Sequence, residues 1–380
     1  MLLDLSPDQA LFRETTARLL DEVAPVAELR RLRDSADGFD ADYWRRGAEL
    51  GWSSLLVSEA HGGGSISGRG LVDLSLVAHE FGCHAAPGPL AVTNVVAATL
   101  SEVGGDELEP AIKDVLSGEA IATWCLSEPP PNDQLGSVSF DIRREGDELV
   151  LAGVKRPVES ASCARYLLVT GRTGSGLTQV LVPHGTPGVS VKPMQSLDTT
   201  RRFDLVTFED VRLPVAGSLI GQLGLAVEQV ERQLSIAVAT CTAESVGAMQ
   251  SAFDMTVEWA FARYSFGRPL ASYQELKHRF ADMKTWLEAS HAVSDAAVDA
   301  VASGAPDAPE LLSAAKSFVG DFGGELMQDC VQIHGGIGVT FEHDLHLYLR
   351  RHTVNRALYG TPSEHRQRLG AMAEKQAVPV

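Results

Sequence analysis

The sequence is poor in the features that mark disulfide-rich, zinc-binding and membrane-spanning proteins. It has five cysteines among 380 residues, at positions 83, 125, 163, 241 and 330, and no two of them form a CxxC pair. This odd and scattered set predicts neither a disulfide framework nor a zinc site, and it favours a reducing, cytoplasmic location. No apolar run approaches the roughly 18 residues of a membrane-spanning helix. The N-terminal stretch turns polar and acidic too early for a signal peptide.

Positive charge is also scarce. The chain carries 32 Lys and Arg residues against 50 Asp and Glu residues, which gives a formal net charge of −18. This balance excludes general binding to nucleic acid or to an anionic membrane, and an anionic ligand would need a local basic patch. The apolar fraction of 44% is ordinary for a globular protein. At this length, two or three core-bearing regions are expected.

Common nucleotide-binding and hydrolase motifs are missing as well. The glycine-rich stretch at 62–70 has neither the spacing nor the strand-to-helix setting of a dinucleotide fingerprint, so it is interpreted as a loop. The sequence has no Walker A lysine and no GxSxG elbow. His343 and His346 lie three residues apart beside Glu342, but no further ligand cluster accompanies them. A helix surface is therefore favoured over a metal site there, and no metal is predicted.

The order of residue patterns predicts an α+β fold of three domains. Residues 1–117 and 221–380 show the helical spacing of apolar residues, whereas 118–220 holds short runs rich in β-branched and aromatic residues, separated by turn signals. Strands that follow one another without helices are typical of a small antiparallel barrel or sandwich, and the later long helices are typical of a bundle. Ser6 is predicted to cap the first helix, with Gln9 closing a capping box.

One acidic residue stands out in the last region. Glu244 is the only charged residue between Ser235 and Phe253. On a helix of small and apolar side chains, this carboxylate is expected to lie partly out of water, and desolvation would raise its pKa toward the range of a working base. A partly exposed glutamate or a structural ion pair explains the pattern equally well. The residues alone leave both interpretations open.

Four segments together resemble a known family. RYSFGRPL (263–270), SYQELKHRFADM (272–283), CVQIHGGIGVTFEHDLHLYLRR (330–351) and GWSSLLVSEAHGGGS (51–65) are similar to segments of the acyl-CoA dehydrogenases. The resemblance covers essentially the whole chain and is strongest to actinobacterial members, including steroid and branched acyl-CoA dehydrogenases. It implies an N-terminal helical domain, a central small antiparallel β-barrel and a C-terminal domain like a four-helix bundle.

The resemblance also implies an FAD-dependent reaction at the α–β bond of an acyl-CoA thioester. In that family a carboxylate removes the α proton while the β hydride passes to the flavin. FAD lies extended between domains and between subunits, and an electron-transferring flavoprotein reoxidises it. Arginine suits the cofactor's phosphates, and glycine lets the backbone approach it. Carried over by position, the cofactor contacts are Ser127, Arg263, Ser265, Phe266, Gln274, Gln332, Gly335, Gly336 and Thr361.

The chain departs from the family pattern in three places. SEPPPNDQLGS (127–137) replaces the usual loop after the flavin-binding hydroxyl, and residues 157–159 (Pro-Val-Glu) replace an aromatic-x-Thr flavin contact. Tyr359 stands before the Gly-Thr pair at 360–361, where many relatives carry the catalytic glutamate. A phenol, with a reference pKa of about 10, is a poor base at neutral pH. Glu364 comes several residues too late, and we expect it on the surface or in a first helical turn.

Some relatives carry the base on the first long helix of the C-terminal domain, which is where Glu244 lies. The sequence therefore predicts an acyl-CoA dehydrogenase with Glu244 as its base, and with bulky, branched or steroid-derived acyl groups among its candidate substrates. Three alternatives stay open: a non-catalytic or cofactor-supporting subunit of a heteromeric acyl-CoA dehydrogenase, another flavin reaction on the same fold, and CoA-thioester binding without turnover.

The predicted partners follow from the same resemblance. They are an acyl-CoA substrate, an electron-transferring flavoprotein as acceptor, and either three further copies of this chain or a second acyl-CoA dehydrogenase chain in a tetramer. Nucleic acid is not expected as a partner, and no membrane span is predicted.

Overall fold

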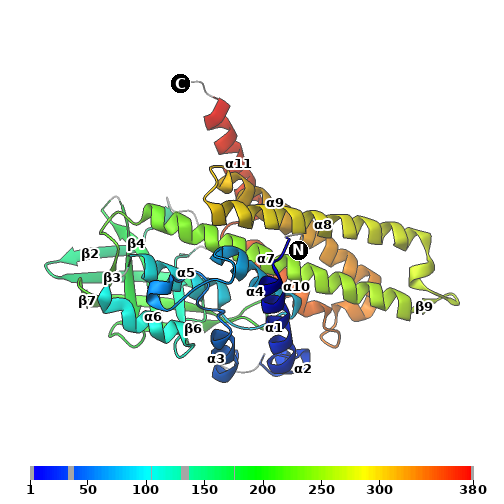
Figure 1. Ribbon diagram of the computed structural model, residues 1–380, viewed down its shortest axis with the longest axis horizontal. Helices are drawn as coiled ribbons and strands as arrows, with labels where there is room; N and C mark the ends of the chain where they lie inside the picture. The colour runs from blue at the N-terminus through cyan, green and yellow to red at the C-terminus, as the bar shows by residue number, and fades with distance from the viewer. Residues whose placement is uncertain (1–3, 33–37, 104, 130–136, 175, 378–380) are drawn as a thin grey trace. The chain divides into compact units, whose positions relative to one another are not determined.

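The computed structural model describes residues 4–32, 38–103, 105–129, 137–174 and 176–377 (Figure 1). The chain divides into two compact units. The sheet unit comprises Arg30–Leu74 and Pro87–Ala237, and the bundle unit comprises Met1–Leu29, Ser75–Ala86 and Val238–Val380. Both units are assembled from separate chain segments. The three-domain division at residues 117 and 220 stays a prediction.

The sheet unit contains one eight-stranded sheet in the described residues. Its strands are β1 (Ala122–Cys125), β2 (Asp141–Glu145), β3 (Glu148–Glu159), β4 (Tyr166–Thr173), β5 (Gly176–Pro183), β6 (Val189–Met194), β7 (Phe203–Pro214) and β8 (Leu219–Ile220). They pair in the order β6-β7-β3-β2-β4-β5-β8, with β1 on β4. Because β6 and β8 end this path, the described sheet is open, and the predicted closed barrel is not found. The sheet is also mixed rather than wholly antiparallel, since β1 and β2 both pair with β4 in parallel.

The residue pattern accounts for these strands. β2 and β3 form a hairpin through Gly146 and Asp147, and Gly146 has a φ of 65°, the left-handed conformation that tight hairpin turns need. Along β5 every residue from 177 to 182 is buried, as expected for a strand that is covered on both faces.

The other regular elements of the sheet unit are helices. They are α2 (Val26–Leu32, shared with the other unit), α3 (Ala41–Glu49), the start of α4 (Gly70–Cys83), α5 (Leu90–Val103), α6 (Glu109–Leu116), the start of α7 (Val227–Ala262), and the short 3-10 helices Glu59–His61 and Asp106–Leu108. α5 is the core helix, because it is buried from Leu90 to Leu100. The Thr93 hydroxyl donates to the carbonyl of Ala122 at 3.1 Å, which ties α5 to β1.

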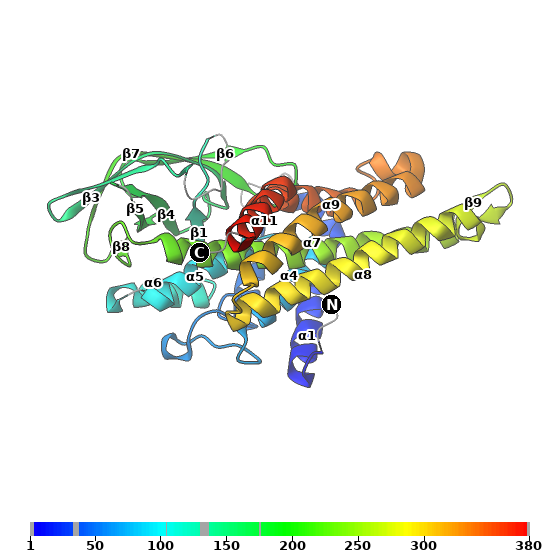
Figure 2. The same cartoon turned by 90° about the horizontal axis from the view of Figure 1, so that it is seen from above.

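The bundle unit is helical. It holds α1 (Pro7–Val23), the end of α4, most of α7 (Val227–Ala262), α8 (Gln274–Ser303), α9 (Ala308–His334), α10 (Leu345–Ala357) and α11 (Pro362–Ala377). α9 contacts α8, α10 and α11, and Figure 2 shows α8 and α9 running side by side. A small hairpin of β9 (Tyr264–Ser265) and β10 (Arg268–Pro269), followed by a 3-10 helix at Leu270–Ser272, joins α7 to α8. Another 3-10 helix, Gly335–Val339, follows α9.

The predicted order of helices, strands and helices is confirmed. The predicted cap of the first helix is also present, because the Gln9 amide donates to the Ser6 hydroxyl at 3.2 Å and the Ser6 amide donates to the Gln9 side chain at 3.1 Å. Among the helices of the described residues, none has both the length and the apolarity needed to cross a membrane.

Candidate functional site

Glu244 lies midway along α7 and holds two hydrogen-bond partners from α10. Its side chain is 13% exposed. Arg351 donates from Nη1 to Oε1 at 2.6 Å, and Asn355 donates from Nδ2 to Oε2 at 2.8 Å. Arg351 and Asn355 are four residues apart, so they lie on the same face of α10. One donor therefore meets each carboxylate oxygen.

Arg351 also connects this carboxylate to the chain that follows α4. Its side chain is fully buried, and its Nη2 donates to the carbonyls of Ala85 at 3.2 Å and Ala86 at 2.8 Å. A buried guanidinium requires both a counter-charge and hydrogen-bond acceptors, and Arg351 finds them on two different elements. The structural ion pair that the sequence left open for Glu244 is present. Its role as a base remains a prediction.

Two glycines bring α4 and α7 into backbone contact beside Glu244. A Cβ on Gly82 would lie 1.9 Å from the carbonyl oxygen of Glu244, and a Cβ on Gly247 would lie 2.0 Å from that of His79. The Ser251 hydroxyl donates to the carbonyl of Cys83 at 2.8 Å one turn further along. The backbone of Glu244 is thus held against α4 at a distance that only glycine allows.

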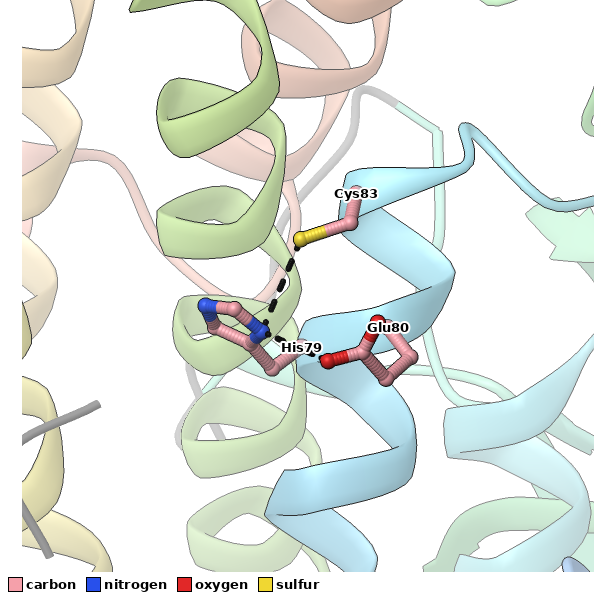
Figure 3. A group of neighbouring side chains, drawn as sticks. All are labelled: His79, Glu80 and Cys83. Carbon is pink, nitrogen blue, oxygen red and sulfur yellow. Dashed lines mark hydrogen bonds and ion pairs between the residues drawn. The ribbon is translucent and has the colours of Figure 1, made fainter. Parts of the chain in front are cut away.

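A polar cluster lies on the same stretch of α4. Figure 3 shows Nδ1 of His79 between the Glu80 carboxylate, at 3.4 Å, and the Cys83 sulfur, at 3.6 Å. These residue types can bind metals. However, Arg13 already pairs with the same Glu80 oxygen at 2.9 Å, and burial raises the pKa of the Cys83 thiol, which disfavours the thiolate. The cluster is therefore best described as a buried hydrogen-bond network.

At the position where the family resemblance places a catalytic glutamate, this chain has Tyr359, followed by Gly360 and Thr361. Tyr359 is buried, at 8% exposure, and has a φ of 59°. The Thr361 amide and hydroxyl both donate to Glu364, at 2.7 and 2.8 Å, and the Glu364 amide donates back to the Thr361 hydroxyl at 3.3 Å. Glu364 therefore lies in the first turn of α11 and caps it. The backbone N–H of Thr361 lowers the pKa of Glu364 from its usual value.

Three of the residues assigned to the cofactor lie at the α7–α8 hairpin. Arg263 is exposed, with its guanidinium 5.9 Å from the centre of the Trp259 ring, and Ser265 is half-buried. Phe266 is 99% exposed and has a φ of 48°. A phenyl ring and a guanidinium presented to solvent on a turn are suited to bind something outside this chain, either an anionic ligand or another subunit.

Four further assigned residues are exposed at the start of α8 and around the end of α9. Gln274 begins α8, Gln332 lies near the end of α9, and Gly335 and Gly336 follow it. A Cβ on either glycine would meet no atom within 4 Å. The backbone here is open to a close approach by a ligand, which is the property that the sequence assigned to these glycines.

Two unsatisfied polar atoms lie beside these glycines. Trp259 and His334 stack with their ring centres 5.1 Å apart. Nδ1 of His334 bonds the carbonyl of Cys330 at 2.8 Å, while Nε2 of His334 and Nε1 of Trp259 are buried with no hydrogen-bond partner in the described structure. Buried polar atoms usually have partners. Open glycines, an exposed arginine and an unused donor and acceptor fit a large ligand with phosphates and polar ring atoms, as FAD is.

The remaining cofactor positions lie in the sheet unit or at α11. Ser127 is half-buried just after β1, and its carbonyl accepts from the Arg156 amide at 2.9 Å. Residues 130–136 of the altered 127–137 loop lie outside the described residues. Glu128 pairs at 2.8 Å with Lys155, whose pKa burial lowers to about 8. Thr361, at α11, uses its hydroxyl in the cap described above.

The altered stretch at 157–159 ends in a second buried ion pair. Glu159 and Arg201 are 4% and 5% exposed, and two parallel hydrogen bonds of 2.6 Å join them. Glu159, which stands at the position of the family's threonine, is therefore bonded to Arg201 in the sheet unit.

Sequence reasoning missed the partners of these carboxylates. Arg351, Asn355, Lys155 and Arg201 were not singled out, because each meets its glutamate across 27 to 111 residues of chain. A signal existed for Arg351: it follows buried Leu347 and Tyr348 by four and three residues, so the three lie on one face of the helix. A charged residue on such a face needs a buried partner.

Comparisons with known proteins bear on the whole chain. Residues 6–119 match the family model described as acyl-CoA dehydrogenase, N-terminal domain, and residues 224–373 match acyl-CoA dehydrogenase, C-terminal domain. Among curated proteins, the acyl-CoA dehydrogenase IpdE2 of Mycolicibacterium smegmatis is 30% identical over 97% of this chain and 99% of its own length.

Solved structures agree. A steroid ACAD variant, Tcur3481-Tcur3483, is 27% identical with a TM-score of 0.87, covering 97% of this chain and 99% of the other. A glutaryl-CoA dehydrogenase from Mycobacterium smegmatis in complex with FADH2 shares the fold, with a TM-score of 0.87 at 20% identity over 98% of this chain and 96% of the other.

Proposed function

Because the chain belongs to the acyl-CoA dehydrogenase family, we propose that it is an FAD-dependent enzyme that forms a double bond between Cα and Cβ of an acyl-CoA thioester. The observation that carries the proposal is the match to both family models together with full-length similarity to an acyl-CoA dehydrogenase. Fold alone would not support a function, because one fold hosts many chemistries.

In this proposal the cofactor is held by the residues that the family resemblance assigns to it. Arg263 neutralises phosphate charge, while Gly335 and Gly336 leave room for the cofactor against the backbone. The Ser127 hydroxyl, Ser265, Phe266, Gln274, Gln332 and Thr361 supply the further contacts carried over from the family. When bound, FAD supplies the acceptor for the hydride that leaves the β carbon.

Glu244 is the proposed base. Its carboxylate takes the α proton of the thioester, and Arg351 and Asn355 hold that carboxylate in one orientation. Tyr359 offers only a phenol at the position where many relatives carry a glutamate, and Glu364 is engaged in the cap of α11. Of the two locations that relatives use for their base, only the helix position is acidic here.

The proposed substrates are bulky, branched or steroid-derived acyl-CoA thioesters. Support comes from the position of the proposed base on α7 and from the likeness to a steroid ACAD at 27% identity. An electron-transferring flavoprotein is the proposed acceptor, and the proposed assembly is a tetramer made of this chain alone or with a second acyl-CoA dehydrogenase chain.

A second candidate function is a cofactor-supporting subunit whose partner chain provides the base. The observation that favours it is the ion pair itself: a glutamate bonded to a fully buried arginine is also what a purely structural pair looks like. The two candidates differ in what the chain does with substrate when its own flavin is present.

The experiment uses the purified chain carrying FAD, with butyryl-, isobutyryl-, octanoyl- and steroid-side-chain-CoA added one at a time. Bleaching of the flavin absorption reports reduction by substrate. Glu244→Gln is expected to keep the flavin and to bleach about 10²- to 10⁴-fold more slowly, as for loss of a general base. Glu258→Gln is the matched control, because Glu258 is an exposed glutamate on the same helix.

The outcomes separate the candidates. Unchanged bleaching in Glu244→Gln would refute Glu244 as the base. A wild-type protein that binds FAD but is bleached by no thioester in the panel would favour the cofactor-supporting subunit. If bleaching then appears only when a second acyl-CoA dehydrogenase chain is co-purified, that chain provides the base.

A further inference from the structure

Arg351 is the residue whose burial most needs an explanation. Its side chain is fully buried, and taking a guanidinium out of water carries a large free-energy cost unless its charge and donors are satisfied. Nη1 meets the Glu244 carboxylate, while Nη2 meets two backbone carbonyls, of Ala85 and Ala86. Nη1 of the guanidinium therefore bonds a side chain, while Nη2 bonds backbone carbonyls, which cannot rotate away as a side chain can.

We infer that Arg351 is the positioning residue for Glu244, setting the direction in which its carboxylate faces the substrate. This inference rests on the proposed function, in which Glu244 removes the α proton. It goes beyond that function by assigning a role to a residue whose side chain is fully buried and bonded to the proposed base.

The rest of the contact network fixes both ends of the pair. The backbone of Glu244 is fixed against α4 through Gly82, as described above. The Asn355 side chain donates to the second carboxylate oxygen of Glu244. The backbone carbonyl of Asn355 in turn accepts from the Lys316 ammonium and from the Cys241 thiol. Because Arg351 and Asn355 are both held by further partners, Glu244 has little freedom to turn. A base works best when such surrounding contacts hold it within a fraction of an ångström.

The geometry explains why this residue is an arginine. A lysine would keep one positive charge near Glu244, but a single ammonium cannot reproduce the rigid fork that spans a carboxylate and two carbonyls. Arg351→Lys therefore tests whether Glu244 needs only the positive charge at this position or also the geometry of the guanidinium. If Arg351 serves only to neutralise Glu244, lysine will replace it; if Arg351 orients Glu244, lysine will not.

The test compares the FAD-loaded wild type with Arg351→Lys and with Arg356→Lys. Arg356 is the matched control: it lies on the same helix and also bonds one carboxylate, of Asp321 at 3.0 Å, and one carbonyl, of Gly320 at 2.9 Å. The readouts are flavin content, unfolding midpoint, kcat and KM, and the rate at which the α proton of the thioester exchanges in D2O. The thioester is the one in the panel that bleaches wild type fastest.

For Arg351→Lys we expect flavin content and KM close to wild type, with kcat and α-proton exchange each about 10- to 100-fold slower, as for a misplaced catalytic group. Arg356→Lys is expected to match wild type in all readouts. A loss of stability alone would not lower kcat while leaving KM and flavin content unchanged.

Asn355→Ala provides a second variant in case Arg351→Lys does not fold. It removes the donor to Oε2 and leaves the arginine pair, so kcat is expected to fall about fivefold with KM unchanged. If Arg351→Lys, or failing it Asn355→Ala, keeps wild-type kcat while Glu244→Gln is inactive, the positioning role is refuted and the proposed base survives. If Glu244→Gln is as active as wild type, or no thioester bleaches the flavin, the proposed base and the positioning role are both refuted.

Discussion

The close crossing of α4 and α7 predicts that a single methyl group at Gly82 destabilises the protein. The Cβ of Gly82→Ala would lie 1.9 Å from the Glu244 carbonyl oxygen and 2.8 Å from the Ala248 nitrogen. Both obstructing atoms are backbone, so no side chain can rotate away to make room. The two helices would have to separate locally by about 1 Å or more, which disturbs the packing of a well-filled core.

The magnitude follows from two opposing contributions. Overpacking a core costs about 1–3 kcal/mol, sometimes more, whereas replacing a helical glycine by alanine returns about 0.5–1 kcal/mol through propensity. A net loss of up to about 2.5 kcal/mol in the free energy of unfolding is expected for Gly82→Ala. Gly324→Ala in α9 is the matched control, because its Cβ would meet no atom within 4 Å. The control is expected to gain about 0.5–1 kcal/mol.

Urea unfolding of both variants, at equal flavin saturation and followed by far-UV circular dichroism, measures the difference. The midpoint should fall for Gly82→Ala and rise for Gly324→Ala. If both midpoints move in the same direction, the helices are not in backbone contact at Gly82, and the backbone support described for Glu244 is wrong.

Two further predictions concern the cap of α11 and the hairpin that joins α7 to α8. Glu364→Ala should lose about 0.5–2 kcal/mol of stability at pH 7, as for a lost helix cap. The Thr361 amide holds the pKa of Glu364 below its usual value, so this contribution is present above about pH 4.5 and is lost as pH falls through the lower folded value. The urea midpoints of variant and wild type should therefore converge as the pH falls below that folded value. Arg263→Gln should lower the ratio of flavin to protein absorbance without changing the unfolding midpoint of the flavin-free chain, since Arg263 is exposed. Lys277→Gln, also exposed, should leave the flavin ratio unchanged; equal ratios in both variants would contradict the assignment of Arg263 to phosphate.

Local features of the fold were predictable from the sequence, and its strand pairing was not. The capping box at Ser6 and the turn at Gly146 depend on residues within a few positions of each other, and both are present. The open, mixed sheet depends on which strands become neighbours. β1 pairs in parallel with β4, which begins about 40 residues later, and nothing in either strand's alternation specifies that partner. The run of short strands left a barrel and a sandwich open, and the barrel that the resemblance implied is not found in the described sheet.

The candidate site, too, was predictable from the sequence only in its local features. Glu244 was recognisable because it is alone among small and apolar neighbours, a local property of 19 residues of sequence. Whether its carboxylate meets solvent, a substrate or a counter-charge depends on Arg351, 107 residues later. Composition could indicate that Glu244 is unusual but not which partner it has. The orphaned atoms of Trp259 and His334 were equally invisible, since an unsatisfied hydrogen bond exists only once the chain is packed.

The discontinuous make-up of the bundle unit has a consequence for how the protein is made. Its first pieces are made well before Val238–Val380 begins: Ser75–Ala86 ends about 150 residues earlier, and Met1–Leu29 ends about 210 residues earlier. At about 5–20 residues per second, the end of α4 waits roughly 8–30 s, and α1 roughly 10–40 s, for the helices they pack against. The sheet unit is complete by Ala237 and can form meanwhile. During this interval nascent chains are therefore expected to have a folded sheet unit and N-terminal helices whose apolar faces are still exposed. A chaperone that binds exposed apolar surface is expected to bind mainly at this stage.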